Sequence, residues 1–545
     1  MLVLTKRAAK ELIKNDNDEY DFLTSYQKFI LEYFHSNEFK DKILLLLYME
    51  VGTGKTLTSL SCGISGIKSG MFKRIVILSP KSVQDEFVKN LEMFNKLSKV
   101  DKFDVGELIM IPYNANNSSV QFKALGDLEN SLFIIDEAHL FMKSVIKVSL
   151  LPNSEVRNIG NAKKIYDAIR KLKNKKILLL TGTPCTKHPF ETVPMWNLAG
   201  CELPKTFNDF CDEYVDGREI KHKNELKKKL NGLVAYVGVH NLPKYKGQVR
   251  AEKLKVIDVE MSENQYKQYL VDYKLELDEK GFTNKKNIYG LPFGMKSSFH
   301  AKTFEDSVYW NDELTNKLHE DRYVGEIKID KEHTPKVIKM YEDSKNINGL
   351  CVFYFRFVKM YGCDTMVKLL EQEGYKRCEK EGVFDKKDKR YVLFTGDISY
   401  STRIAWKNIF NDKRNMQGEY VKYLILSPSG SVGVTLKNVR YLGIGSCEFQ
   451  LSTLRQIMGR CNRLNSHLDL EDKDRTLVNY LYLASKNKKY YKNHTDEVNE
   501  LCKRTAPDWS EQAPTIERCI YQDSLIDDEI NESFRSCLRE ISIIK

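Results

Sequence analysis

Residues 44–56 read Leu-Leu-Leu-Leu-Tyr-Met-Glu-Val-Gly-Thr-Gly-Lys-Thr, an apolar run that leads directly into a glycine-rich turn. The next stretch, Leu57–Ile67, is compatible with a helix. Glycines here let backbone N–H groups curl around phosphate oxygens, and a helix N-terminus adds positive potential. Because Met49 stands where the full phosphate-loop pattern has its first glycine, a chance loop is the alternative. The predicted nucleotide-binding residues are Gly52, Thr53, Gly54, Lys55 and Thr56.

An acidic pair follows a second apolar run. Leu132–Ile135 is followed by Asp136, Glu137, Ala138 and His139. An Mg²⁺-dependent nucleotide hydrolase needs such a pair, in which Asp136 and Thr56 hold the metal and Glu137 polarises the attacking water. The alternative is a strand that ends in a solvated acidic turn.

Two further motifs follow in order. The run Lys176–Leu180 leads into Thr181-Gly182-Thr183-Pro184, and Thr181 and Thr183 are candidates for coupling the nucleotide to a second ligand. The segment Gln456–Arg463 carries Arg460 and Arg463, which share one face if the segment is helical. Directed at a γ-phosphate, guanidinium groups stabilise transition-state charge, so both arginines are predicted catalytic residues together with Lys55, Asp136 and Glu137. A solvated basic helix face is the alternative.

The pattern of apolar runs predicts two α/β sheets, because runs of strand length alternate with charged helical segments. The chain has 545 residues, of which 42% are hydrophobic and 30% charged, as in soluble globular proteins of several domains. The strands expected in the first half are Ile43–Met49, Arg74–Leu78, Leu108–Ile111, Leu132–Ile135 and Lys176–Leu180. Those expected in the second half are Gly349–Tyr354, Tyr391–Phe394, Val421–Leu426, Tyr441–Ile444 and Leu477–Leu483.

The expected domains are an ATP-binding lobe over 1–245, a second lobe over 246–500 with an insertion at about 276–332, and a helical tail over 501–545. The basic stretch Lys221–Lys255 is either a duplex-facing surface or a solvated helix and hairpin. Aromatic residues of the insertion either stack on bases or pack the insertion onto its lobe; they are Phe282, Tyr289, Phe293 and Phe299.

The formal net charge of +11 hints at a polyanionic partner. No apolar run approaches the length of a membrane span, and the charged N-terminus does not fit a signal peptide. The twelve cysteines are scattered without a Cys-x-x-Cys pair, which favours free thiols over zinc sites or disulfides. We therefore expect a cytoplasmic protein without a membrane association.

Together, these motifs resemble those of superfamily 2 helicases and translocases over about residues 20–490. The resemblance implies two tandem RecA-like parallel-sheet lobes, ATP and Mg²⁺ as cofactors, and a nucleic-acid partner. It places Gln27 and Gln456 with the nucleotide and adds Gly433 to the coupling residues. It also nominates residues for contact with a nucleic-acid backbone, namely Ser79, Lys81, Ser429 and Thr435.

Within this superfamily the chain resembles helicases of cytoplasmic DNA viruses and virus-like elements. These include the poxvirus nucleoside triphosphate phosphohydrolase I, the small subunit of the poxvirus early transcription factor, and relatives on yeast cytoplasmic linear plasmids. Ile457 departs from the RNA-helicase pattern, and Lys187 stands where relatives often have Asn. In the first departure the chain resembles the duplex-tracking, remodeller-like branch of the superfamily. We therefore expect it to move on DNA rather than RNA, and strand separation is in doubt.

Two functions follow from the resemblance. The first is a nucleic-acid-dependent ATPase acting in cytoplasmic transcription. The alternative is a transcription-complex subunit that binds an RNA polymerase, a promoter or mRNA-capping machinery and uses hydrolysis for release or termination. A kinase or an AAA+ ring would not explain a second lobe with Gln456–Arg463.

Overall fold

The computed structural model describes residues 18–50, 52–149, 160–238, 249–280, 301–310, 327–378, 388–431, 434–463, 465–504 and 512–544. By their contacts, the residues form two compact units. Unit 1 comprises Met1–Cys185, Pro189–Asn241 and Glu532–Lys545. Unit 2 comprises Thr186–His188 and Leu242–Asn531.

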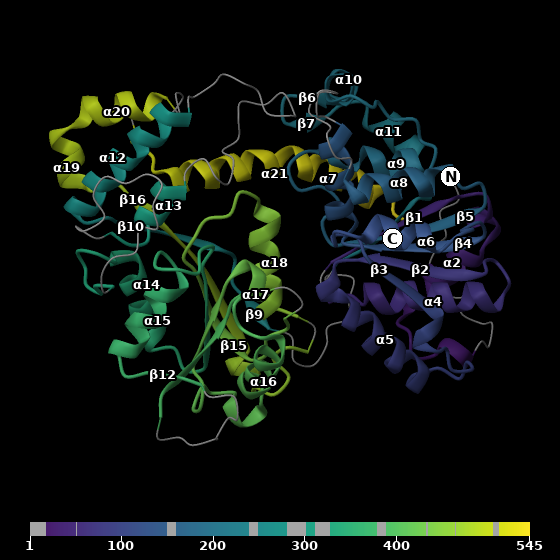
Figure 1. Cartoon of the computed structure of the whole chain (residues 1–545), viewed down its shortest axis with the longest axis horizontal. Coiled ribbons are helices and arrows are strands. Elements are labelled where there is room, and N and C mark those ends of the chain that lie inside the picture. Colours follow the sequence, from purple (N-terminus) through teal and green to yellow (C-terminus); the bar gives the residue numbers. More distant parts are fainter. Residues whose placement is uncertain are drawn as a thin grey trace. The chain divides into compact units, whose positions relative to one another are not determined.

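Unit 1 contains a parallel sheet with the strand order β3-β2-β4-β5-β1-β8 (Figure 1). Its strands are apolar on both faces, as expected of a parallel sheet covered by helices on both sides. They are β1 (Leu44–Met49), β2 (Arg74–Ser79), β3 (Leu108–Pro112), β4 (Ser131–Asp136), β5 (Lys175–Thr181) and β8 (Val234–Val237). A separate hairpin pairs β6 (Val215–Asp216) with β7 (Glu219–Ile220).

The helices of unit 1 fill the connections between these strands. They are α2 (Ser25–His35), α3 (Asn37–Lys40), α4 (Lys55–Lys68), α5 (Gln84–Leu97), α6 (Ser118–Ala124), α7 (Ala138–Ser149), α8 (Asn161–Lys171), α9 (Val193–Leu198), α10 (Phe207–Tyr214) and α11 (Lys223–Leu230). Alternate residues of β1, Leu45 and Leu47, share one hydrophobic cluster with α2, α4 and α5. Figure 1 shows α4 and α5 on that one face of the sheet.

Unit 2 contains a second parallel sheet, ordered β10-β16-β15-β11-β14-β13-β12, and β9 pairs with β16. Its strands are β9 (Arg250–Ala251), β10 (Lys255–Glu260), β11 (Leu350–Tyr354), β12 (Lys376–Arg377), β13 (Arg390–Phe394), β14 (Tyr423–Leu426), β15 (Val439–Ile444) and β16 (Thr476–Ser485). The five runs expected in the second half of the chain are all strands of this sheet.

Helices cover both faces of the second sheet. α14 and α15 pack on one face, whereas α12, α16, α18, α20 and the start of α21 contribute to the cluster on the other. The helices that begin in unit 2 are α12 (Glu263–Lys280), α13 (Ala301–Asp306), α14 (Pro335–Lys345), α15 (Cys363–Gln372), α16 (Tyr400–Phe410), α17 (Pro428–Ser431), α18 (Leu451–Cys461), α19 (Lys488–Asn493), α20 (Thr495–Lys503) and α21 (Ile516–Glu540).

The predicted class, α/β with two tandem parallel sheets, is confirmed. The domain bounds remain a prediction, but the contacts divide the chain differently near its end. Residues up to Asn531 cluster with unit 2, and Glu532–Lys545 clusters with unit 1, so the contacts do not separate residues 501–545 as one group. Much of the predicted insertion, at 281–300 and 311–326, lies outside the described residues, as do its four named aromatic residues.

All twelve cysteines lie in the described part of the chain and are free thiols, as predicted. Among the helices of that part, none combines the length and the apolar character that crossing a membrane requires.

Candidate active site

The glycine-rich loop connects the end of β1 to the start of α4. Gly52 and Gly54 have φ angles of 88° and 81°, in the left-handed region that favours glycine. Gly54 is the N-cap of α4, and a Cβ atom at this position would lie 2.6 Å from Nε2 of Gln27. The Lys55 ammonium group donates a hydrogen bond to the Met49 carbonyl at 3.3 Å, which folds its side chain back over the loop. The local geometry therefore requires glycine where the phosphate-loop pattern places it.

Gln27 and its neighbour Tyr26 hold this loop from outside. The Gln27 amide donates to the carbonyl of Gly54 at 3.4 Å and to the hydroxyl of Thr58 at 3.2 Å. The Tyr26 hydroxyl donates to the Thr53 carbonyl at 2.9 Å. Gln27 is 4% exposed, and it lies beside the loop as predicted. Contact with a base stays a prediction, since the amide contacts shown here are all with protein groups.

The acidic pair lies where β4 ends. Asp136 is only 4% exposed, and its Oδ1 accepts the backbone N–H of Glu137 at 2.9 Å. Burial, followed by the neighbouring Glu137 charge, raises the pKa of Asp136 to about 7, while Lys55 acts in the opposite direction. Glu137 has a φ angle of 46°, a strained conformation for a residue other than glycine. The parallel sheet thus places Lys55, Asp136 and Glu137 at its carboxyl edge, where ligands of α/β proteins bind.

A divalent cation fits this group. Burial and the neighbouring Glu137 charge raise the pKa of Asp136, so a positive charge close to it would stabilise its ionised form. The Thr56 hydroxyl and the Asp136 carboxylate are hard oxygen ligands of the type that Mg²⁺ prefers. The described residues contain no group of three or more metal-binding side chains.

His139 connects the acidic pair with the loop after β5. Its Nδ1 lies 2.9 Å from the Thr181 hydroxyl and 3.5 Å from a carboxylate oxygen of Glu137. Burial lowers the pKa of His139, which favours the neutral ring. The Thr181 hydroxyl in turn accepts the backbone N–H of Thr183 at 3.0 Å. Our site prediction missed His139, although it is the fourth residue of the quoted Asp136–His139 motif.

The two predicted arginines do not share a helix. α18 ends at Cys461, so Arg460 lies in its last turn and Arg463 lies beyond it. The expectation of one shared helical face was wrong, because Asn462 leaves the helical conformation with a ψ angle of 81°. Arg463 instead donates to the Thr435 hydroxyl at 2.5 Å. Gln456 lies on α18 and is half-buried.

The candidate nucleic-acid contacts differ in exposure. Ser79 is fully buried at the end of β2, and its contact with a nucleic-acid backbone stays a prediction. Its strand lies between β3 and β4 in the sheet. Lys81 and Ser429 are exposed, and the Thr435 hydroxyl is occupied by Arg463. Gly433 lies outside the described residues.

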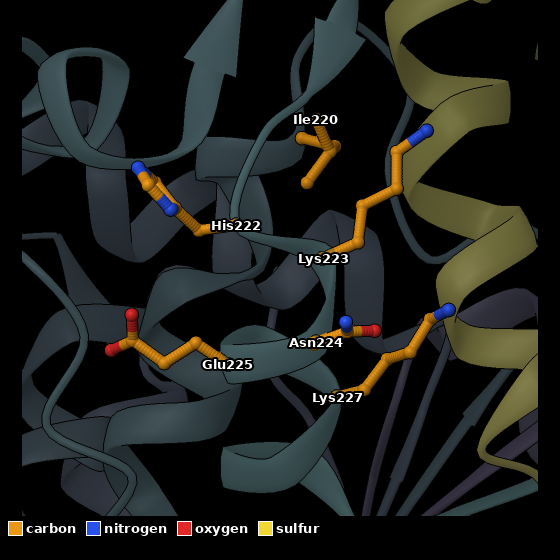
Figure 2. Close-up of a pocket in the computed structure, with 6 residues that line it drawn as sticks. All are labelled: Ile220, His222, Lys223, Asn224, Glu225 and Lys227. Atoms are coloured by element: carbon orange, nitrogen blue, oxygen red, sulfur yellow. The ribbon is translucent and has the colours of Figure 1, made fainter.

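Three of the four lysines of α11 form ion pairs within unit 1. Lys223 contacts Glu219 at 3.2 Å, Lys229 contacts Glu225 at 3.3 Å, and Lys227 pairs with Glu540. A shallow hollow at this helix, shown in Figure 2, is lined by Ile220, His222, Lys223, Asn224, Glu225 and Lys227. It contains none of the glycine-rich or acidic motif residues. These pairs favour the solvated helix over a duplex-facing surface for this part of the basic stretch.

Comparison with protein families identifies two domains in the chain. The SNF2-related domain matches residues 26–305, slightly more than half of the chain. The helicase conserved C-terminal domain matches residues 336–465. The first match includes every predicted motif of unit 1, and the second includes the arginine-bearing helix α18.

Named relatives come from large DNA viruses. The termination factor NPH-I homolog of African swine fever virus is 28% identical over 559 residues, which cover 92% of this chain and 76% of the relative. Nucleoside triphosphatase I of Choristoneura fumiferana entomopoxvirus is 26% identical, covering 83% of this chain and 72% of the relative. Among solved structures, the Sulfolobus solfataricus SWI2/SNF2 ATPase core in complex with dsDNA is 15% identical to this chain, with a TM-score of 0.34. The match covers 95% of this chain and 97% of the chain in that structure.

Proposed function

Because the chain belongs to the SNF2-related family of superfamily 2 helicases and is an ATP hydrolase of that type, we propose that nucleic acid stimulates its ATP hydrolysis. The observation that carries the proposal is the convergence of Lys55, Asp136 and Glu137 at one sheet edge. A lysine that reaches phosphate, a buried metal-binding carboxylate and a second carboxylate beside it are the groups that phosphoryl transfer to water requires.

In this proposal the residues of unit 1 bind and activate the reactants. Loop N–H groups between Gly52 and Thr56 bind phosphate oxygens, and Lys55 adds positive charge at the β- and γ-phosphates. Thr56 and Asp136 would hold Mg²⁺, which when bound neutralises phosphate charge. Glu137 orients the attacking water and accepts its proton, a role for which its position next to the buried Asp136 is suited.

The arginines of unit 2 supply the remaining charge. We assign Arg460 and Arg463 to stabilisation of the charge that develops on the transferred phosphoryl group. The bond between Arg463 and Thr435 links the segment that binds nucleic acid in this proposal to an arginine that acts on phosphate. Thr181, Thr183 and Gly433 would couple hydrolysis to movement along the polymer.

The proposed track is duplex DNA rather than RNA. The match to an SNF2-related domain supports a duplex-tracking enzyme. Lys81 and Ser429 are exposed and are suited to backbone contacts, which provide affinity without sequence preference. Such contacts make binding depend strongly on salt concentration.

The test is the steady-state ATPase rate without nucleic acid and with single-stranded DNA, duplex DNA or RNA. We expect the largest stimulation with duplex DNA and none in Lys55→Ala, which removes the phosphate-binding charge. Lys68→Ala, at the exposed far end of α4, is the matched control and should keep the wild-type rate. Normal ATPase activity in Lys55→Ala would contradict the proposal.

A second function is favoured by the name of one relative, a termination factor. In this alternative the chain is a subunit of a cytoplasmic transcription complex, and hydrolysis serves release or termination. Its partners would be an RNA polymerase or mRNA-capping machinery. Co-purification of the full chain with a polymerase, together with a basal ATPase rate that free nucleic acid does not raise, would favour this alternative over the first.

A further inference from the structure

The C-terminal helix α21 is divided between the two units. It runs without interruption over 25 residues, from Ile516 to Glu540. Its residues up to Asn531 cluster with unit 2, and those from Glu532 cluster with unit 1. None of the sequence motifs lies on this helix, yet two of its acidic residues contact Arg455 and Lys187, which lie close in the chain to two of the motifs.

The first contact is with the helix that carries the arginine motif. Arg455 of α18 forms a two-pronged ion pair with Asp528 of α21, with N–O distances of 2.9 and 2.5 Å. Asp528 is 18% exposed, and the planar guanidinium group fixes the relative orientation of the two side chains. Arg455 precedes Arg460 by five residues on the same helix, so whatever orients Arg455 also orients the arginine-bearing turn.

The second contact is with the loop after β5. Lys187 pairs with Asp527 at 3.4 Å, and these side chains are 23% and 19% exposed. The buried Asn531 side chain donates to the Thr186 carbonyl at 3.1 Å. By its contacts the tripeptide Thr186–His188 belongs to unit 2. In the chain it begins three residues after Thr183, one of the proposed coupling residues.

α21 is itself fixed at its start. Glu517 in its first turn pairs with Lys336 at 2.7 Å, and both side chains are at most 1% exposed. Glu517 also accepts the backbone N–H of Ala484 at 2.7 Å. Breaking a buried pair of this kind costs several kcal/mol, because one charge is left without a partner. The helix therefore cannot slide along its axis without a large loss of stability.

The far end of α21 is held in unit 1. Glu540 pairs with Lys227, and Figure 2 shows Lys223 and Lys227 extending toward the α21 ribbon. The Ser533 hydroxyl accepts the Ile220 N–H at 3.0 Å. Just beyond the helix, the backbone N–H of Ile543 donates a hydrogen bond to the Val234 carbonyl on the edge strand β8 at 2.9 Å. These contacts bind the last turns of the helix within unit 1.

A single exposed ion pair contributes little, usually 0 to about 1 kcal/mol. The two pairs on α21 differ from that case because their carboxylates are mostly buried, are adjacent in sequence, and lie on a helix whose first turn is fixed by a buried ion pair. We expect these pairs to affect the orientation of α18 and of the loop after β5 more than the free energy of unfolding. Misplacement of a catalytic group by about 1 Å can lower a rate by as much as 100-fold.

We propose that Asp527 and Asp528 are positioning residues for hydrolysis: α21 orients α18 through Arg455 and the loop after Thr183 through Lys187. The inference rests on the proposed function. It adds α21, a helix without any of the sequence motifs, to the parts of the chain that support hydrolysis. Neither aspartate is proposed to touch the nucleotide or the nucleic acid.

The experiment exchanges the charges of each pair in the full chain. Arg455→Glu and Asp528→Arg alone should each lower kcat about tenfold while KM for ATP changes less than about twofold, since the nucleotide-binding loop is untouched. The double variant should recover most of kcat. Lys187→Asp and Asp527→Lys form the second set, with the same expected pattern. Asp496→Arg, at an exposed position of α20, is the matched control for a reversed acidic charge.

Amide hydrogen exchange of α18 and of residues 181–188 provides a readout that does not need ATPase activity. Exchange should rise in the single variants and return to the wild-type level in the double variants. Wild-type kcat in the single variants would overturn the inference, as would a loss of activity that the double exchange does not restore. A wild-type protein that does not hydrolyse ATP, but shows the expected exchange pattern, would count against the proposed function alone.

Discussion

The candidate functional groups of the two units differ in the sign of their charge and in how that charge is paired. In unit 1, Asp136 is buried next to a second carboxylate, and its pKa rises to about 7. In unit 2, Arg463 already donates to Thr435 and Arg455 is paired with Asp528. Unit 1 therefore presents negative charge that a cation would stabilise, whereas unit 2 presents positive charge that the protein holds in place. In the proposed function, a nucleotide with its metal ion would complement the first group, and the charge that develops on the phosphoryl group would complement the second.

Among the variants that test this comparison, Glu137→Gln should lower the ATPase rate most. The change keeps the size of the side chain but removes the proton acceptor, so we expect the ATPase rate to fall by about 100-fold or more. Binding of ATP should persist, because Lys55 and the loop are intact. Burst and steady-state phosphate release measure the rate, and Glu92→Gln on the exposed side of α5 is the control. A rate near wild type would remove Glu137 from the mechanism.

Arg463→Ala tests the other half of the comparison. Loss of a guanidinium group that acts only in the transition state should lower kcat by about 100-fold and leave KM for ATP nearly unchanged. Arg463→Lys keeps the charge but lacks the planar fork, and we expect only partial recovery. Steady-state kinetics with saturating nucleic acid measures both constants. A rise in KM without a change in kcat would show instead that Arg463 binds ground-state ATP.

Thr435→Val tests whether the hydrogen bond from Arg463 to the Thr435 hydroxyl contributes to kcat. The two side chains have similar shapes, but valine cannot accept the hydrogen bond, which for a charged donor contributes about 1.5–3 kcal/mol. We expect kcat to fall about tenfold, by the conversion of 1.4 kcal/mol per factor of ten. Thr435→Ser restores the acceptor and should behave as wild type. Equal rates for the valine and serine variants would mean that another contact positions Arg463.

The smallest effects concern nucleic-acid contacts of unit 1. Ser79→Ala should change stimulation by nucleic acid less than about twofold, because its side chain is fully buried. Lys81→Ala removes an exposed charge and should weaken nucleic-acid binding a few-fold and reduce its salt dependence by about one phosphate contact. Titration of the ATPase rate with duplex DNA at several salt concentrations compares the two. A large effect at Ser79 together with none at Lys81 would reverse this assignment.

The predictable parts of the fold are those whose causes are local. Each apolar run of strand length in the expected set is a strand, because residues that are apolar on both faces can only be buried in a covered parallel sheet. The strand β8 was missed, since Val234–Val237 is short and stands within a charged region. The shared face of Arg460 and Arg463 was mispredicted because the helix end depends on the conformation of Asn462, for which the spacing carries no signal.

The sequence by itself determined the glycine-rich loop, the acidic pair and the order of the motifs, because each is a strand followed by a turn whose geometry depends on a few consecutive residues. The tertiary structure alone decided that His139 contacts Thr181, that Ser79 is buried, and that α21 contacts Arg455 and Lys187. Asn531 and Thr186 are 345 residues apart in the chain. Contacts over such separations depend on which surfaces pack together, and neither residue type nor local spacing encodes that choice.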